Sequence, residues 1–270
     1  MRGARLALLV CFLCLASLAA TGCARRAGGF TVAGSTSVQP FAEMLSEEYT
    51  AAHPEEHVSV QGGGSSAGIE AVTSGAAEIG MSSRELKGDE RKLVRVEIAR
   101  DAIAVVDNPA NPVRNLTTEQ VRKIFSGQIR SWSEVGGPDR EIHVVTREEG
   151  SGTRGAFQDL VLGKDVDVDP GALVQDSNGA VRQLVSSDPN AIGYISLGLV
   201  NEAVRAISLD GVAPTAEHVN AGTYKLVRPF LFVLRPGSES SAAGFIQYVL
   251  SPEGQRSLAH EGLLSPSGGK

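Results

Sequence analysis

The chain has 270 residues, enough for one or two domains with a substantial buried core. Hydrophobic residues make up 42% and charged residues 21%, a composition that excludes a predominantly disordered chain. The formal net charge of −6 argues against a general nucleic-acid-binding protein, which needs a basic surface to displace counterions. Aromatic residues are only 5%, so few side chains are available for stacking on bases or sugars.

The first 22 residues have the pattern of a secretory signal. Arg2 and Arg5 precede an apolar run at 6–20, which is shorter than the roughly 20 residues that cross a bilayer. The run ends in Ala-Thr-Gly-Cys, which resembles a bacterial lipobox, so we expect Cys23 to be lipidated and to become the mature N-terminus. The alternative is an ordinary cleavage site beside an incidental Cys.

Removal of this segment would change both the cysteine count and the charge. Cys11 and Cys14 lie inside the apolar run and would leave with it, so their spacing is not interpreted as a redox motif. The removed segment carries two Arg and no acidic residue, so the formal charge would fall from −6 to −8. We expect residues 24–29 to form a short tether to the membrane surface.

The body of the chain alternates strand and helix patterns. One expected helix has Phe41, Leu45 and Tyr49 at a spacing of four residues. Such alternation predicts a largely parallel sheet covered by helices. We expect strands at 30–33, 57–61, 78–81, 93–98, 101–106, 141–146, 191–195 and 227–234, and helices at 38–52, 67–74, 118–125, 151–162, 178–186 and within 241–261.

Three Gly/Ser/Thr turns, at 34–37, 64–66 and 150–153, each follow a strand and open a helix. A helix N-terminus has unsatisfied N–H groups and a partial positive charge, and Ser and Thr hydroxyls add further donors. Each turn alone is explained more simply by helix capping. Three such turns at the carboxyl ends of strands, where open α/β sheets bind ligands, together predict an anion site.

The sharpest motif is Arg-Glu-Glu-Gly-Ser-Gly-Thr at 147–153. The guanidinium of Arg147 could bind two oxygens of a tetrahedral oxyanion. Glu149, by its position, could hold that arginine in place. The alternative is a surface arginine beside two acids.

Four segments in chain order carry a resemblance to a known family. They are Gly-Ser-Thr-Ser-Val from Gly34, Gln-Gly-Gly-Gly-Ser-Ser-Ala-Gly from Gln61, Glu-Ile-Gly-Met-Ser-Ser-Arg from Glu78, and the motif at 147–153. Together they resemble the phosphate-binding proteins of bacterial phosphate ABC importers, as do Ile-Phe-Ser-Gly from Ile124 and Ala-Ile-Gly-Tyr from Ala191. The similar segments run from about residue 30 to about residue 262.

This resemblance implies an α/β fold of the periplasmic-binding-protein kind, type II-like, with two lobes, two hinge crossings and a cleft between the lobes. We expect lobe one to comprise 30–106 plus 227–270 and lobe two to comprise 107–226. The crossings are expected near 107–112, where Pro and Asn cluster, and near 224–229.

The resemblance further implies a site that closes on one dehydrated phosphate, with Arg147 as the charged clamp. Its hydroxyl and backbone donors would be Thr36, Ser37 and Ser65 in lobe one and Ser151, Gly152 and Thr153 in lobe two.

One position differs from the better-known form of the family. That form has an Asp that accepts the proton of phosphate, where this chain has Ser83. A hydroxyl can donate or accept, so sulfate would be excluded less strictly. Arg84 would add a second positive charge to the site, or else be an exposed residue in a salt bridge.

The resemblance thus implies a non-enzymatic, lipid-anchored extracytoplasmic receptor that hands inorganic phosphate to an ABC permease. We expect no cofactor, no metal and no nucleic-acid partner, a monomeric chain, and an anchor in the cell membrane or the periplasm-facing outer membrane. The alternatives are a receptor for another tetrahedral oxyanion, a phosphate sensor, and a serine-type hydrolase built on Ser151. For the last, Ser151 does not stand in a Gly-x-Ser-x-Gly elbow.

Overall fold

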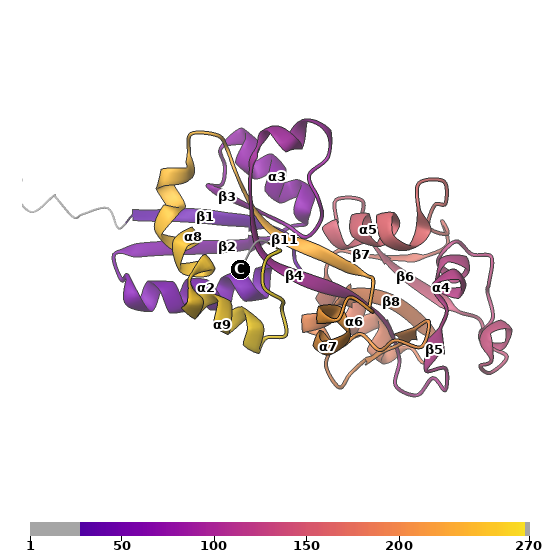
Figure 1. Cartoon of the computed structure of the whole chain (residues 1–270). Helices are drawn as coiled ribbons and strands as arrows, with labels where there is room; N and C mark the ends of the chain where they lie inside the picture. Colours follow the sequence, from indigo (N-terminus) through magenta and orange to yellow (C-terminus); the bar gives the residue numbers. More distant parts are fainter. Residues whose placement is uncertain (1–27, 268–270) are drawn as a thin grey trace, which may run out of the picture.

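The computed structural model describes residues 28–267 (Figure 1). The predicted signal at 1–22, the lipidation site Cys23 and residues 24–27 of the predicted tether lie outside the described residues. Gly28 and Gly29, which we had assigned to the tether, instead begin the first strand, β1 (Gly28–Gly34), because they pair with Glu56 and His57.

The first three strands of the chain pair parallel and form one part of the sheet in the first lobe. Strand β1 lies between β2 (Glu56–Gly62) and β3 (Ile79–Ser82), and helices α2 (Gln39–Ala52) and α3 (Ser65–Ser74) make the connections. Helix α2 buries the Phe, Leu and Tyr that recur every four residues along it, as the sequence predicted. The helix that this four-residue spacing predicted is therefore present, and the α/β fold is confirmed for this part of the chain.

Two neighbouring strands cross between the lobes, β4 (Val94–Asp107) and β11 (Val227–Leu234) (Figure 1). They pair antiparallel along the whole length of β11. The sequence predicted two strands where β4 is a single strand of 14 residues. The first crossing was expected at 107–112, but Ile98 packs in the core of lobe one and Ile103 already packs in that of lobe two. That expectation is corrected: the chain crosses inside β4, because the strand runs straight from one core into the other.

The second lobe continues the same mixed sheet. Strand β8 (Ala191–Ser196) pairs with β4, followed by β6 (His143–Arg147) and β7 (Leu173–Gln175). Its core contains closely packed rings, including a stacked Phe157–Tyr194 pair whose centroids are 4.1 Å apart. The remaining elements of this lobe are β5 (Asn115–Leu116), α4 (Thr118–Phe125), η2 (Trp132–Val135), α5 (Gly152–Phe157), η3 (Gln158–Leu162), α6 (Asn178–Ser187), η4 (Leu197–Leu199), β9 (Arg205–Ala206), β10 (Ser208–Leu209) and α7 (Ala216–Asn220).

The C-terminal segment returns to the first lobe and contains η5 (Glu239–Ala242), α8 (Ala243–Leu250) and α9 (Pro252–His260). The remaining short helix, η1 (Gly88–Lys92), comes earlier in the chain, directly before β4. The helical stretch expected within 241–261 is divided because Ser251 caps α9 and Pro252 begins it. Between residues 28 and 267, no helix has the length and apolar character needed to cross a membrane.

Candidate anion-binding site

The carboxyl ends of β1, β2 and β6 bring the three predicted turns to one place between the lobes. The hydroxyls of Ser37 and Thr153, from opposite lobes, are 2.8 Å apart. The backbone N–H of Ser66 donates to the carbonyl of Gly150 across the same gap at 3.1 Å. The lobes are therefore closed on each other, and the expected site residues that lie buried there are Ser37, Ser65, Ser83, Arg84, Arg147, Ser151, Gly152 and Thr153, with Thr36 half-buried.

Arg147 lies at the end of β6 and is only 1% exposed. Its Nε and Nη2 donate to the two carboxylate oxygens of Glu148, each at 2.9 Å. Nη2 also donates to the Thr36 hydroxyl at 3.3 Å, which links the two lobes. The buried Nη1 has no hydrogen-bond partner among the residues that the structure describes, which leaves its donors available to an anion.

The carboxylate that holds this arginine is not the one we expected. Glu148 pairs with Arg147, whereas Glu149 is exposed. The N–H of Glu148 bonds to the carbonyl of Gln175 at 3.2 Å, so the β6–β7 ladder extends by one residue and keeps Glu148 beside the guanidinium. The chain then turns, because Ser151 N–H donates to the Glu148 carbonyl, and this turn carries Glu149 outward.

A second buried arginine, Arg228 on β11, was missed by the sequence analysis. It faces its cross-strand neighbour Asp101, and its Nε and Nη2 donate to one Asp101 oxygen at 3.0 and 2.9 Å. The Nη2 also donates to the Ser37 hydroxyl at 3.1 Å. Burial raises the pKa of Asp101 and lowers that of Arg228, and the attraction between them opposes both shifts.

Asn178, at the start of α6, was also missed. It is 1% exposed and lies between the lobes. Its Nδ2 donates to the hydroxyls of Thr36 and Ser37 at 3.2 and 2.9 Å, and its Oδ1 accepts from the N–H of Ser196 at 3.1 Å. The contacts of Arg228 and Asn178 with Thr36 and Ser37 join positions 141 to 191 residues apart, so no local signal in the sequence reveals them.

Ser65 and Ser83 face Gly152 from the first lobe. The N–H of Ser83 donates to the Ser65 hydroxyl at 3.1 Å, and the Ser35 hydroxyl donates to that of Ser83 at 2.9 Å. A methyl group on Gly152 would lie 2.2 Å from the Ser65 hydroxyl oxygen and 2.5 Å from that of Ser83. The absence of a side chain at Gly152 therefore permits this close approach of the lobes.

Ser151 and Arg84 have their side chains engaged elsewhere. The Ser151 hydroxyl accepts from the N–H of Arg154 and caps α5, which is the capping role that we weighed for each turn. Arg84 forms a salt bridge with Glu90, with contacts of 2.7 and 2.9 Å, and also donates to the Ser66 hydroxyl. It is thus in a salt bridge, as one of our two interpretations held, but it is buried rather than exposed.

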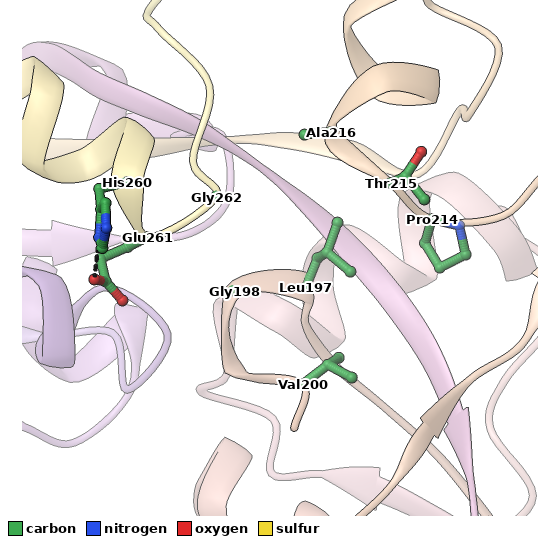
Figure 2. A pocket seen from close by; sticks show the side chains of 9 residues that line it. All are labelled: Leu197, Gly198, Val200, Pro214, Thr215, Ala216, His260, Glu261 and Gly262. Carbon is green, nitrogen blue, oxygen red and sulfur yellow. Dashed lines mark hydrogen bonds and ion pairs between the residues drawn. The ribbon is translucent and has the colours of Figure 1, made fainter. Parts of the chain in front are cut away.

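A separate open pocket of about 400 Å³ lies between the end of α9 and the segments around η4 and α7 (Figure 2). Among the described residues, His260 and Glu261 are the only ionisable ones that line it, and they contact each other at 3.3 Å. No Arg or Lys of residues 28–267 lines this pocket, so these residues give it no guanidinium like that of Arg147 in the anion site.

A sequence profile described as a PBP superfamily domain matches residues 19–253. The phosphate-binding protein PstS of Bacillus subtilis is 32% identical over 244 residues, which cover 88% of this chain and 81% of that protein. The chain belongs to the PstS family of the PBP superfamily.

Solved structures agree with membership of the PstS family. A putative phosphate ABC transporter substrate-binding protein with bound phosphate, from Clostridium perfringens, is 42% identical with a TM-score of 0.86, and the match covers 88% of this chain and all of that one. An ABC-type phosphate transport receptor from Vibrio cholerae is 40% identical with a TM-score of 0.74, at the same coverage of both chains. The two-lobed binding-protein fold that the sequence predicted is thereby confirmed.

Proposed function

We propose that this protein is a phosphate receptor of an ABC importer and holds inorganic phosphate between its lobes. The observation that carries the proposal is the buried guanidinium of Arg147, whose Nη2 reaches the Thr36 hydroxyl of the other lobe and whose Nη1 has no hydrogen-bond partner among residues 28–267. The PstS relatives, which are named for phosphate binding and for substrate binding to a transporter, support the same ligand. The role is that of a carrier rather than an enzyme.

The binding residues that we propose are the ones expected from the sequence. Arg147 supplies charge, and Thr36, Ser37, Ser65, Ser83 and Thr153 supply hydroxyls. Gly152 supplies a backbone N–H group at the start of α5, and Ser151 holds that helix start in place by capping it. Arg84 acts on the anion only through the electric field of its positive charge, which the salt bridge with Glu90 partly offsets. Lobe closure removes water from the anion, which strengthens each of these contacts.

Calorimetry of the purified mature chain with phosphate, sulfate, arsenate and molybdate tests the ligand. Phosphate should bind most tightly. Tighter binding of sulfate would contradict the proposal and favour a receptor for another oxyanion. Turnover of an ester substrate that Ser151→Ala abolishes would favour the hydrolase instead, although the Ser151 hydroxyl already caps α5.

Gly152→Ala should weaken phosphate binding by at least tenfold. The new methyl group would collide with the hydroxyls of Ser65 and Ser83, so the lobes could not close fully. Gly150→Ala is the matched control in the same turn, because its methyl group would meet nothing closer than 3.7 Å. Calorimetry of both variants checks the prediction, and equal losses in the two would contradict the closure argument.

We propose that Cys23 carries the lipid anchor, with the chain monomeric and facing the periplasm. Cys23→Ser should move the protein from the membrane pellet to the soluble fraction of cells that express it. Mass spectrometry of the wild-type N-terminus should show an acylated Cys23. An unmodified N-terminus elsewhere in the chain would instead support ordinary signal cleavage.

A further inference from the structure

The Ser37 hydroxyl has both of its acceptor positions filled. It receives one hydrogen bond from Arg228 Nη2 at 3.1 Å and another from Asn178 Nδ2 at 2.9 Å. A guanidinium and an amide NH₂ can only donate, and a hydroxyl oxygen has two lone pairs and one hydrogen. Ser37 must therefore give its own hydrogen away, and in the closed structure the Thr153 hydroxyl lies in reach at 2.8 Å.

Both acceptor positions of the Thr36 hydroxyl are also occupied. It accepts from Arg147 Nη2 at 3.3 Å and from Asn178 Nδ2 at 3.2 Å. No acceptor for its own hydrogen is found among the side chains and backbone of residues 28–267. Two adjacent hydroxyls at the start of α2 are thus both fixed as donors.

The amide of Asn178 cannot turn over to reverse this arrangement. Its Oδ1 accepts from the peptide N–H of Ser196, which can only donate, so the NH₂ group must face the two hydroxyls. The Ser196 hydroxyl in turn donates to Asp101 at 2.9 Å, and Asp101 holds Arg228. A single buried hydrogen-bond network therefore fixes the orientation of both Arg228 and Asn178, the two residues that donate to the Ser37 hydroxyl.

We propose that Asn178 and Arg228 are specificity-determining positioning residues, which lock the Thr36 and Ser37 hydroxyls as donors to an anion oxygen that carries no proton. This proposal rests on the proposed phosphate function and refines its ligand. A protonated oxygen needs an acceptor, and this side of the site offers none from these two hydroxyls. The phosphate dianion has three oxygens without a proton and the monoanion only two, so these two donors favour the dianion over the monoanion.

Calorimetry of Asn178→Ala at pH 5.5 and pH 8 tests the proposal. Wild type should bind phosphate at least tenfold more tightly at pH 8, where the dianion dominates. The variant should lose most of that advantage, because freed hydroxyls can rotate to accept from the monoanion. Sulfate stays a dianion at both pH values, so its affinity should fall by the same factor at each.

Asn108→Ala is the control, because Asn108 is also buried and donates to two oxygens, the carbonyls of Val185 and Ser186, outside the site. It should leave the pH profile of phosphate binding unchanged. If thermal unfolding shows that Asn178→Ala does not fold, Asn178→Ser replaces it, since a serine hydroxyl can still accept from Ser196.

A double-mutant cycle separates positioning from direct contact. In a Ser37→Ala background, Asn178→Ala should cost clearly less phosphate affinity at pH 8 than it does in wild type, because one of the two hydroxyls that it orients is gone. Additive losses in the cycle, or an equal phosphate loss at both pH values, would overturn the proposal. A wild-type chain that binds no phosphate would instead refute the proposed function itself.

Discussion

Replacing Arg147 with alanine should weaken phosphate binding by about 30-fold to 4,000-fold. Truncating one partner of a buried, charge-assisted pair costs roughly 2–5 kcal/mol, and each 1.4 kcal/mol is a factor of ten. Arg147 is 1% exposed and has an unpartnered Nη1, so water cannot replace its charge in the closed site. Calorimetry of the variant with phosphate gives the measurement.

The control for this prediction is Arg140→Ala, which removes an exposed guanidinium from the same lobe. It should leave phosphate affinity within about twofold, because exposed charges are screened by solvent and salt. Unchanged affinity in Arg147→Ala would refute the clamp role. Equal losses in both variants would show that only the overall charge of the lobe matters.

Replacing Asp101 with alanine should lower the melting temperature by about 6–20 °C. The change leaves Arg228 as an unpaired charge in the interior, which costs about 3–5 kcal/mol. In proteins of 150–250 residues, each kcal/mol shifts the midpoint by about 2–4 °C. Both side chains are 1% exposed, so neither can gain water without rearrangement of the strands that cross between the lobes. Thermal unfolding of the purified variant checks this.

The double variant Asp101→Leu with Arg228→Met provides the comparison. Replacing both members of a buried pair with apolar groups is often close to neutral, so it should recover much of the lost stability. Its phosphate affinity should nevertheless be lower than that of the wild type, because Ser37 would have lost the Arg228 donor. A double variant no more stable than Asp101→Ala would show that the pair itself is not the source of the loss.

The local periodicity predicted most of the fold, and the exceptions have a common cause. The strands around β1 and the helix α2 follow from alternating and four-residue patterns that lie within one short segment. The single strand β4 was predicted as two, at 93–98 and 101–106, with Asp101 at the start of the second. Asp101 is accommodated inside the strand because its partner Arg228 comes 127 residues later.

The same contrast holds within the site. The three turns could be predicted because Ser, Thr and Gly at helix starts are local signals. Asn178 could not, since its role depends on which hydroxyls from the other lobe it meets. The choice between Glu148 and Glu149 depended on how far the β6–β7 pairing extends, which the sequence of β6 alone does not determine.

The pairing of β4 with β11 also limits how the lobes can move. Where the chain passes between the lobes, the two strands pair as one ribbon with a single register shift between Phe230 and Leu231, and Asp101 and Arg228 face each other across it. A two-stranded ribbon bends far more easily than it shears, because shear would break its ladder of hydrogen bonds. The lobes are therefore expected to open and close mainly by one motion, which is bending of this ribbon. Less of the free energy of anion binding is then needed to restrict sideways or sliding motions of the lobes, since the hydrogen-bonded pair of β4 and β11 already opposes them.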